Sequence, residues 1–179
     1  MALSSKIYKA RLNIADLDRH YYSDHALTLA RHPSETEERL MLRLLAFALD
    51  ASDDLSFGKG LSNDEEPDLW LRSQSGEIDL WIDLGTPDPD RIRKACGRAR
   101  QVKLYCYGRR AVPAWWQRHG KTLARFDNLT VWEISGDSCD ELAGMAALSM
   151  DLQCTIEGGL AWVSDATRQV QIAPHKLTD

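Results

Sequence analysis

Two aspartates stand at the ends of neighbouring predicted strands, and their carboxylates give them a clear capacity for chemistry. Asp68 lies at the beginning of a strand expected over 67–73, and Asp83 lies near the end of a strand expected over 78–84. Because side chains alternate along a strand, Asp83 shares a face with Trp81. Two carboxylates on adjacent strands can share one hard cation such as Mg²⁺ when they point to the same face. The alternative is that both are ordinary acids, one on a half-buried strand and one beside a solvated loop.

The elements that must position these aspartates alternate between helix and strand. Hydrophobic periodicity predicts an α-β-β-β-α-β order. The expected bounds are helix 35–51, strands 55–57, 67–73 and 78–84, helix 88–100 and strand 102–107. Ser34 and Glu37 fit a capping box at the start of the first helix. The apolar face of this helix is wide, so we expect the helix to be well buried.

The two ends of the chain are predicted to be rich in strands. The first thirty residues indicate a hairpin with its turn at 16–18. The elements expected after residue 107 are a helix from 113, strand 129–134, helix 138–150 and strands 153–157, 160–164 and 168–173. The fold class is therefore mixed α/β, with a central mixed sheet flanked by helices and terminal strands that could form a second sheet. A length of 179 residues suits a single domain, 1–179.

The central order of elements, with acids at these two places, resembles the core of the PD-(D/E)xK nucleases. The resemblance implies that Asp68 and Asp83 bind Mg²⁺ beside a scissile phosphodiester, where the metal polarises the phosphoryl oxygen. A neighbouring cation would stabilise the charge that grows on the phosphate. The third motif position is Gly85 rather than lysine. By the same resemblance, Lys94 on the next helix is the first choice to replace that lysine, and Glu38 on the first helix adds a carboxylate.

Each of these assignments has a structural alternative. Lys103 and Arg72 are further candidates for the missing lysine. The alternative for Lys94 is an ordinary surface lysine with no role in a site. Glu38 lies in a first helical turn, where an acid is favoured by the helix dipole in any case. Gly85 is explained if the chain needs a glycine to turn into the following helix.

Longer stretches of the chain resemble the YaeQ family of bacterial proteins over nearly the whole length. These stretches are Lys6-Ile-Tyr-Lys-Ala10, Thr28-Leu-Ala-Arg-His-Pro-Ser-Glu-Thr36, Glu38-Arg-Leu-Met-Leu-Arg-Leu-Leu45, Ile78-Asp-Leu-Trp-Ile-Asp-Leu-Gly85 and Arg91-Ile-Arg-Lys-Ala95. The resemblance implies a compact fold built around a variant PD-(D/E)xK motif. It implies no particular reaction.

Charge is distributed unevenly along a chain whose net charge is −5. Residues 50–90 contain 12 acidic and two basic side chains, whereas 91–125 contain 11 basic and no acidic ones. A local basic face can bind phosphates even when the whole chain is acidic. The candidate nucleic-acid-binding residues are Arg91, Arg98, Lys103, Arg109 and Arg110. The alternative is that the bases pair with the acidic block and that the interleaved aromatic residues belong to the core.

Composition argues against a wholly disordered chain, a collagen and a small protein held together by disulfides. An apolar fraction of 44% and a charged fraction of 27% are typical of a globular chain. The four cysteines form no CxxC pair, so we expect free thiols in a cytoplasmic protein. The start of the chain lacks a long apolar segment, so we expect no membrane partner.

Three functions follow as hypotheses: a Mg²⁺-dependent nuclease-like enzyme, a non-catalytic nucleic-acid-binding protein, and a protein-interaction domain.

Overall fold

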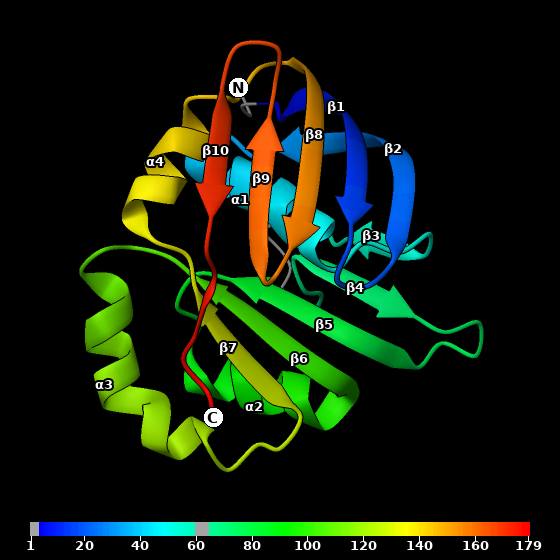
Figure 1. Ribbon diagram of the computed structural model, residues 1–179. Coiled ribbons are helices and arrows are strands. Elements are labelled where there is room, and N and C mark those ends of the chain that lie inside the picture. The colour runs from blue at the N-terminus through cyan, green and yellow to red at the C-terminus, as the bar shows by residue number, and fades with distance from the viewer. Residues whose placement is uncertain (1–3, 60–64) are drawn as a thin grey trace. The chain divides into compact units, whose positions relative to one another are not determined.

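The computed structural model describes residues 4–59 and 65–179. These residues form two mixed sheets and four helices (Figure 1). Contacts divide the chain into two compact units. The terminal unit comprises the described part of Met1–Ala51 together with Asp137–Ala173. The central unit comprises the described part of Ser52–Gly136 together with Pro174–Asp179. Each unit has one sheet.

The terminal unit contains a five-stranded sheet with the order β10-β9-β8-β1-β2. Its strands are β1 (Lys6–Asp16), β2 (Tyr21–Arg31), β8 (Ser149–Glu157), β9 (Leu160–Ser164) and β10 (Gln169–Ile172). All neighbours are antiparallel except β1 and β8, which are parallel. The prediction that the strand-rich ends form a second sheet is therefore confirmed.

Alternating burial along β1 explains how this sheet covers a core. Tyr8, Ala10, Leu12 and Ile14 are buried, whereas the intervening residues of the strand are largely exposed. This period of two places one face of the strand against apolar neighbours. On α1 (Glu37–Leu49) every residue from 40 to 48 is buried, which confirms the prediction of a well-buried helix. In Figure 1, α1 passes behind the sheet of the terminal unit.

The start of α1 differs from the predicted capping box. Thr36 is the N-cap, and its hydroxyl oxygen accepts a hydrogen bond from the Arg39 amide at 3.1 Å. Ser34 instead contacts His32 Nδ1 with its hydroxyl at 2.6 Å. The capping-box prediction was wrong because Thr36, two residues later, occupies the position from which a side-chain oxygen reaches the first free amides.

The last helix also differs from its prediction. α4 spans Gly136–Ala143, and β8 already begins at Ser149, so the expected helix over 138–150 was too long. Residues 149–157 alternate between exposed and buried along the whole strand. The buried residues of this run, Met150, Leu152, Cys154 and Ile156, recur with a period of two, and the run pairs with β1 as a strand.

The central unit contains a six-stranded sheet with the order β11-β7-β6-β5-β4-β3. Its strands are β3 (Leu55–Phe57), β4 (Leu69–Arg72), β5 (Ile78–Leu84), β6 (Ala99–Cys106), β7 (Leu129–Glu133) and β11 (His175–Lys176). β5, β6 and β7 are mutually parallel, joined through α2 (Pro89–Arg98) and α3 (Ala111–Leu123). Both helices pack on the same face, because one apolar cluster includes residues of β5, β6 and β7 together with Ile92 and Leu123.

This arrangement changes the expected grouping of the central elements. The helix predicted over 35–51 is α1, and it belongs to the terminal unit rather than to the compact unit that contains β3, β4, β5, α2 and β6. The reason is that α1 supplies Met41, Leu44 and Leu45 to an apolar lining shared with Leu12 and Leu152 of the terminal sheet.

All four cysteines are free thiols, and that of Cys106 gives a test at alkaline pH. Burial, with a further contribution from the charge of Glu133, raises the pKa of Cys106 to about 12 from an ordinary value of 9.0. The unfolded thiol ionises above about pH 9 whereas the folded one stays protonated. The contribution of this thiol to the free energy of unfolding is therefore fully present below about pH 9. It decreases as the pH rises towards 12, by up to about 1.4 kcal/mol per pH unit.

Urea denaturation from about pH 8 to about pH 10.5 checks this expectation. The difference in free energy of unfolding between wild type and Cys106→Ala should narrow as the pH rises, because the variant has no thiol to ionise. Parallel pH profiles of the two proteins would contradict it.

Candidate functional site

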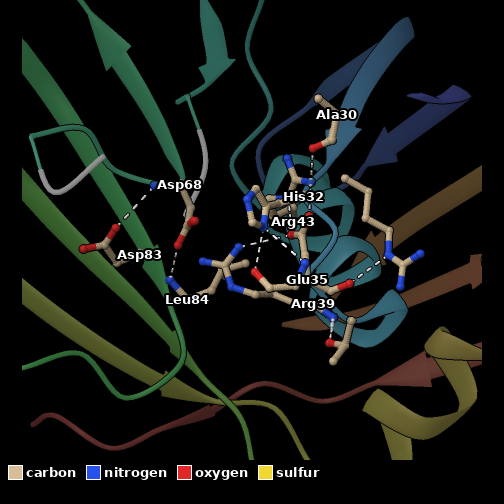
Figure 2. Close-up of polar contacts among 11 residues, drawn as sticks. Ala30, His32, Glu35, Arg39, Arg43, Asp68, Asp83 and Leu84 are labelled. Atoms are coloured by element: carbon tan, nitrogen blue, oxygen red, sulfur yellow. Dashed lines mark hydrogen bonds and ion pairs between the residues drawn. The ribbon is translucent and has the colours of Figure 1, made fainter. Parts of the chain in front are cut away.

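The ends of β4 and β5 bring Asp68 and Asp83 together in the central unit, as the sequence predicts. The Asp68 amide donates a hydrogen bond to Asp83 Oδ1 at 3.3 Å, and the Leu84 amide donates to Asp68 Oδ2 at 2.9 Å (Figure 2). Both aspartates are buried, with 8% and 2% of their surface exposed. Each carboxylate is thus bonded to the backbone of the neighbouring strand.

Two glycines beside the aspartates meet different requirements of the backbone. A Cβ atom at Gly58 would lie 1.9 Å from the carbonyl oxygen of Pro67, and the Gly58 amide donates to the Asp68 carbonyl at 2.9 Å. Gly85 has a φ of +91°, in the left-handed region that favours glycine. A lysine at position 85 would be strained, which supports the reading of Gly85 as a turn residue.

Arg91 on α2 forms an ion pair with Asp83. Its Nε donates to Asp83 Oδ2 at 2.8 Å and its Nη2 donates to Asp83 Oδ1 at 3.1 Å. The same Nη2 donates to the carbonyl oxygen of Glu66 at 2.9 Å. Trp81, two residues before Asp83 on the same strand face, adds a hydrogen bond from its indole Nε1 to Asp83 Oδ2 at 3.0 Å. In the ion pair of Arg91 with Asp83, the aspartate side chain is buried, with 3% of its surface exposed.

These contacts decide how well Asp83 suits a metal ion. A carboxylate offers about four lone-pair positions, and Asp83 accepts four hydrogen bonds, from Asp68, Trp81 and twice from Arg91. Mg²⁺ would need one of these positions, so Asp83 does not fit the metal while Arg91 is paired with it. Within the described ranges 4–59 and 65–179 no three His, Cys, Asp or Glu side chains are grouped to hold a metal ion. The magnesium site at Asp68 and Asp83 stays a prediction.

Lys94 is exposed on α2 and lies in the same unit as the aspartates. Across the described part of the chain it makes no hydrogen bond or ion pair. It lines an open groove of about 650 Å³. The other lining residues are Glu65, Trp81, Asp88, Asp90, Arg91, Arg93, Ala95, Gly97 and Arg98. Lys94 therefore stands beside Arg91 without joining the ion pair.

Glu38, the remaining predicted catalytic residue, lies in the first turn of α1. It is half-buried and belongs to the terminal unit, whereas Asp68, Asp83 and Lys94 belong to the central unit. Its assignment as an assisting carboxylate stays a prediction.

The arginines of α2, together with Arg100 just after it, pair with acids of the preceding block. Arg93 Nε lies 3.4 Å from Asp90 Oδ1, and Arg98 Nη1 lies 3.6 Å from Glu65 Oε2. Arg100 pairs with two further acids of that block. The guanidinium carbon of Arg98 also lies 5.2 Å from the ring centre of Trp81. This is the arrangement expected if acidic and basic blocks neutralise each other, and it includes Arg91 and Arg98 of the predicted nucleic-acid face.

The bases of α3 are arranged differently. Arg110, Arg118, Lys121 and Arg125 are all exposed, and none forms an ion pair with any residue that the structure describes. Arg118 and Lys121 lie within α3 on neighbouring turns, three residues apart, whereas Arg110 is the N-cap of the helix and Arg125 follows its last residue, Leu123, by two positions. We call this set the α3 basic stripe. It contains Arg110 from the predicted nucleic-acid residues. Lys103 and Arg109 lie outside the stripe, half-buried on β6 and exposed just before α3 respectively.

Three features of the site were not anticipated. The pairing of Arg91 with Asp83 joins residues eight apart through a turn, and no local signal predicts it. Trp81 as a hydrogen-bond donor was open to inference, because the alternation of β5 places it beside Asp83. In the terminal unit, the buried ion pair of Glu35 with Arg43 was also not anticipated, because its two residues lie eight positions apart along the chain.

Comparison with known proteins places the chain in a family. A family model described as YaeQ protein matches residues 1–174. Proteins named uncharacterized protein YaeQ from Salmonella typhi and Escherichia coli (strain K12) are 51% and 47% identical over 172 residues, covering 96% of this chain and 95% of each relative.

Solved structures agree with these matches. The crystal structure of YaeQ protein from Xanthomonas axonopodis pv. citri is 45% identical with a TM-score of 0.95, covering 98% of this chain and 99% of that one. YaeQ protein from Pseudomonas syringae is 34% identical with a TM-score of 0.93, covering 98% and 97%. The resemblance carried by the sequence motifs is confirmed, and the chain belongs to the YaeQ family.

Proposed function

We propose that this protein binds nucleic acid through the α3 basic stripe. The observation that carries the proposal is the contrast between two sets of bases in one unit. The arginines of α2 are matched by Asp83, Asp90 and Glu65, whereas the stripe presents four exposed positive charges on α3 and at its two ends. Unmatched charges grouped in this way attract the phosphates of a nucleic-acid backbone, because each contact releases condensed counterions.

The aromatic residues of α3 contribute less to this proposal than the sequence suggested. Trp115 and Trp116 are half-buried and pack against the apolar cluster of the central unit. The Trp115 indole also donates to the Pro87 carbonyl at 3.0 Å. The proposed contact is therefore with phosphates rather than with stacked bases, and we expect little dependence on base sequence.

A triple substitution tests the role of the stripe. Arg118→Gln, Lys121→Gln and Arg125→Gln together should lower the affinity for a single-stranded oligonucleotide, measured by fluorescence anisotropy over a salt series. Each phosphate contact contributes about 0.7 to the slope of log K against log salt for single strands, so the slope should fall by about 2.

Arg93→Gln with Arg98→Gln is the matched control, because these bases already have acidic partners, and the slope should change little. Binding by the wild type that ignores salt would contradict the proposal, as would the absence of binding at low salt. An unchanged slope in the triple variant would move the contact to another surface. Absence of nucleic-acid binding would favour a protein-interaction domain.

Magnesium-dependent phosphodiester hydrolysis is the second candidate. Its support is the adjacency of Asp68 and Asp83 at neighbouring strand ends, as in a variant PD-(D/E)xK core, to which we propose that the central unit is related. The pairing of Asp83 with Arg91 weighs against it, because Arg91 would have to move before a metal could bind. Metal-dependent cleavage of DNA or RNA that is lost in Asp68→Asn would support this candidate over simple binding.

A further inference from the structure

We infer that Arg91 is a built-in cation that takes the place of a divalent metal at Asp83, so that its removal creates a metal site that the wild type lacks. The inference concerns the carboxylate site alone and does not depend on nucleic-acid binding by α3. It explains why two buried aspartates stand side by side where the sequence predicts magnesium.

The surroundings of the Arg91 guanidinium are those of a hard cation. Its acceptors include Asp83 Oδ2 at 2.8 Å, Asp83 Oδ1 at 3.1 Å and the Glu66 carbonyl at 2.9 Å. Carboxylate and backbone carbonyl oxygens are the donors that Mg²⁺ and Ca²⁺ prefer. A planar guanidinium matches a carboxylate with two parallel hydrogen bonds, and so it binds these oxygens in an orientation that lysine could not reproduce.

The helix that carries Arg91 is held at a defined position. The Asp88 side chain caps α2 by accepting from the Asp90 amide at 2.8 Å, and Pro89 occupies the first helical turn. Ile92, the next residue after Arg91, is fully buried in the apolar cluster. These contacts fix the start of the helix, so the guanidinium is presented to Asp83 by a rigid element.

The burial of Asp83 makes a cation at this position necessary. An ionised carboxylate that loses its partner inside a protein is strongly destabilising, because the remaining charge is neither solvated nor paired. In wild type, Arg91 supplies that partner and fills two of the lone-pair positions a metal would use. Without the guanidinium, the oxygens of Asp83 and of the Glu66 carbonyl face a vacant, negatively charged position.

The test compares Arg91→Met with the wild type in a magnesium titration. Methionine keeps the apolar length of the side chain and removes its charge. We expect the Tm of Arg91→Met to fall by about 5–15 °C. Added MgCl₂, at a concentration about tenfold above its Kd, should then raise that Tm by about 3–6 °C. The wild type should show no such saturable rise, with ionic strength held constant by NaCl.

Two further variants complete the test. Arg91→Met with Asp83→Asn should lose the response to magnesium, and Arg93→Met, whose partner Asp90 is exposed, should behave as the wild type. If Arg91→Met fails to fold, calorimetry on the wild type still decides: saturable magnesium binding that Asp83→Asn abolishes would overturn the inference. A folded Arg91→Met whose Tm does not respond to magnesium would overturn it as well.

Discussion

Arg43→Met is expected to lower the free energy of unfolding by about 3–5 kcal/mol, because it removes two hydrogen bonds to the buried Glu35 carboxylate, each worth about 1.5–3 kcal/mol. Arg39, whose Nη1 lies 3.2 Å from Glu35 Oε1, stays as a partner in the variant. Arg43 Nε donates to Glu35 Oε1 at 2.8 Å, and Arg43 Nη2 donates to Glu35 Oε2 at 2.7 Å (Figure 2). The two side chains are 5% and 2% exposed. The same Nη2 donates to the Ala30 carbonyl at 3.0 Å, so the pair also joins α1 to the end of β2.

Urea denaturation monitored by circular dichroism measures this effect. Arg93→Met is the control, since Arg93 and Asp90 are 52% and 80% exposed and such a pair contributes at most about 1 kcal/mol. If Arg43→Met and Arg93→Met lowered the free energy of unfolding by the same amount, the buried ion pair would contribute no more to stability than the exposed one.

Asp83→Asn is expected to have an effect of similar size in the central unit, about 3–5 kcal/mol. The substitution keeps the shape of the side chain but removes the charge that Arg91 requires. It also turns one acceptor oxygen into an amino group, which then faces either Trp81 Nε1, if it replaces Oδ2, or the Asp68 amide, if it replaces Oδ1. A buried donor that faces another donor loses its hydrogen bond and bears the cost of desolvation.

Asp79→Asn is the matched control on the same strand and the same face. Asp79 is 34% exposed in its side chain and lies 3.3 Å from the exposed Arg100, so its loss should change stability by less than about 1 kcal/mol. Both free energies come from equilibrium denaturation at neutral pH. If Asp83→Asn proves as mild as Asp79→Asn, the carboxylate is not the central structural acid that its contacts indicate.

The two buried ion pairs also explain how α1 and α2 are oriented on their own sheets. In each unit an arginine from a helix reaches a buried acid and a backbone carbonyl at the same time. Arg43 reaches Glu35 and Ala30, and Arg91 reaches Asp83 and Glu66. Such pairs contribute little to net stability compared with apolar packing, but they penalise any arrangement in which the partners separate.

Local elements of this chain were largely predictable from its sequence. β5 has the expected bounds, 78–84, because Ile78, Leu80, Ile82 and Leu84 recur with a period of two. Pro89 lies in the first turn of α2, since its ring suits a position with no hydrogen bond to lose. Helix ends were less predictable, because Ser34 and Thr36 are both capping residues and only the course of the chain distinguishes them.

The sequence by itself therefore determined the family, the mixed α/β class and the two adjacent aspartates. The tertiary structure decided which partners those residues have. Periodicity reports that a side chain is buried, but it does not report which group lies opposite. The pairing of Asp83 with Arg91 and the parallel pairing of β1 with β8, whose residues lie about 140 positions apart, depend on how distant segments meet. For this reason Asp68 and Asp83 could be predicted as a pair of acids, whereas the pairing of Arg91 with Asp83 could not.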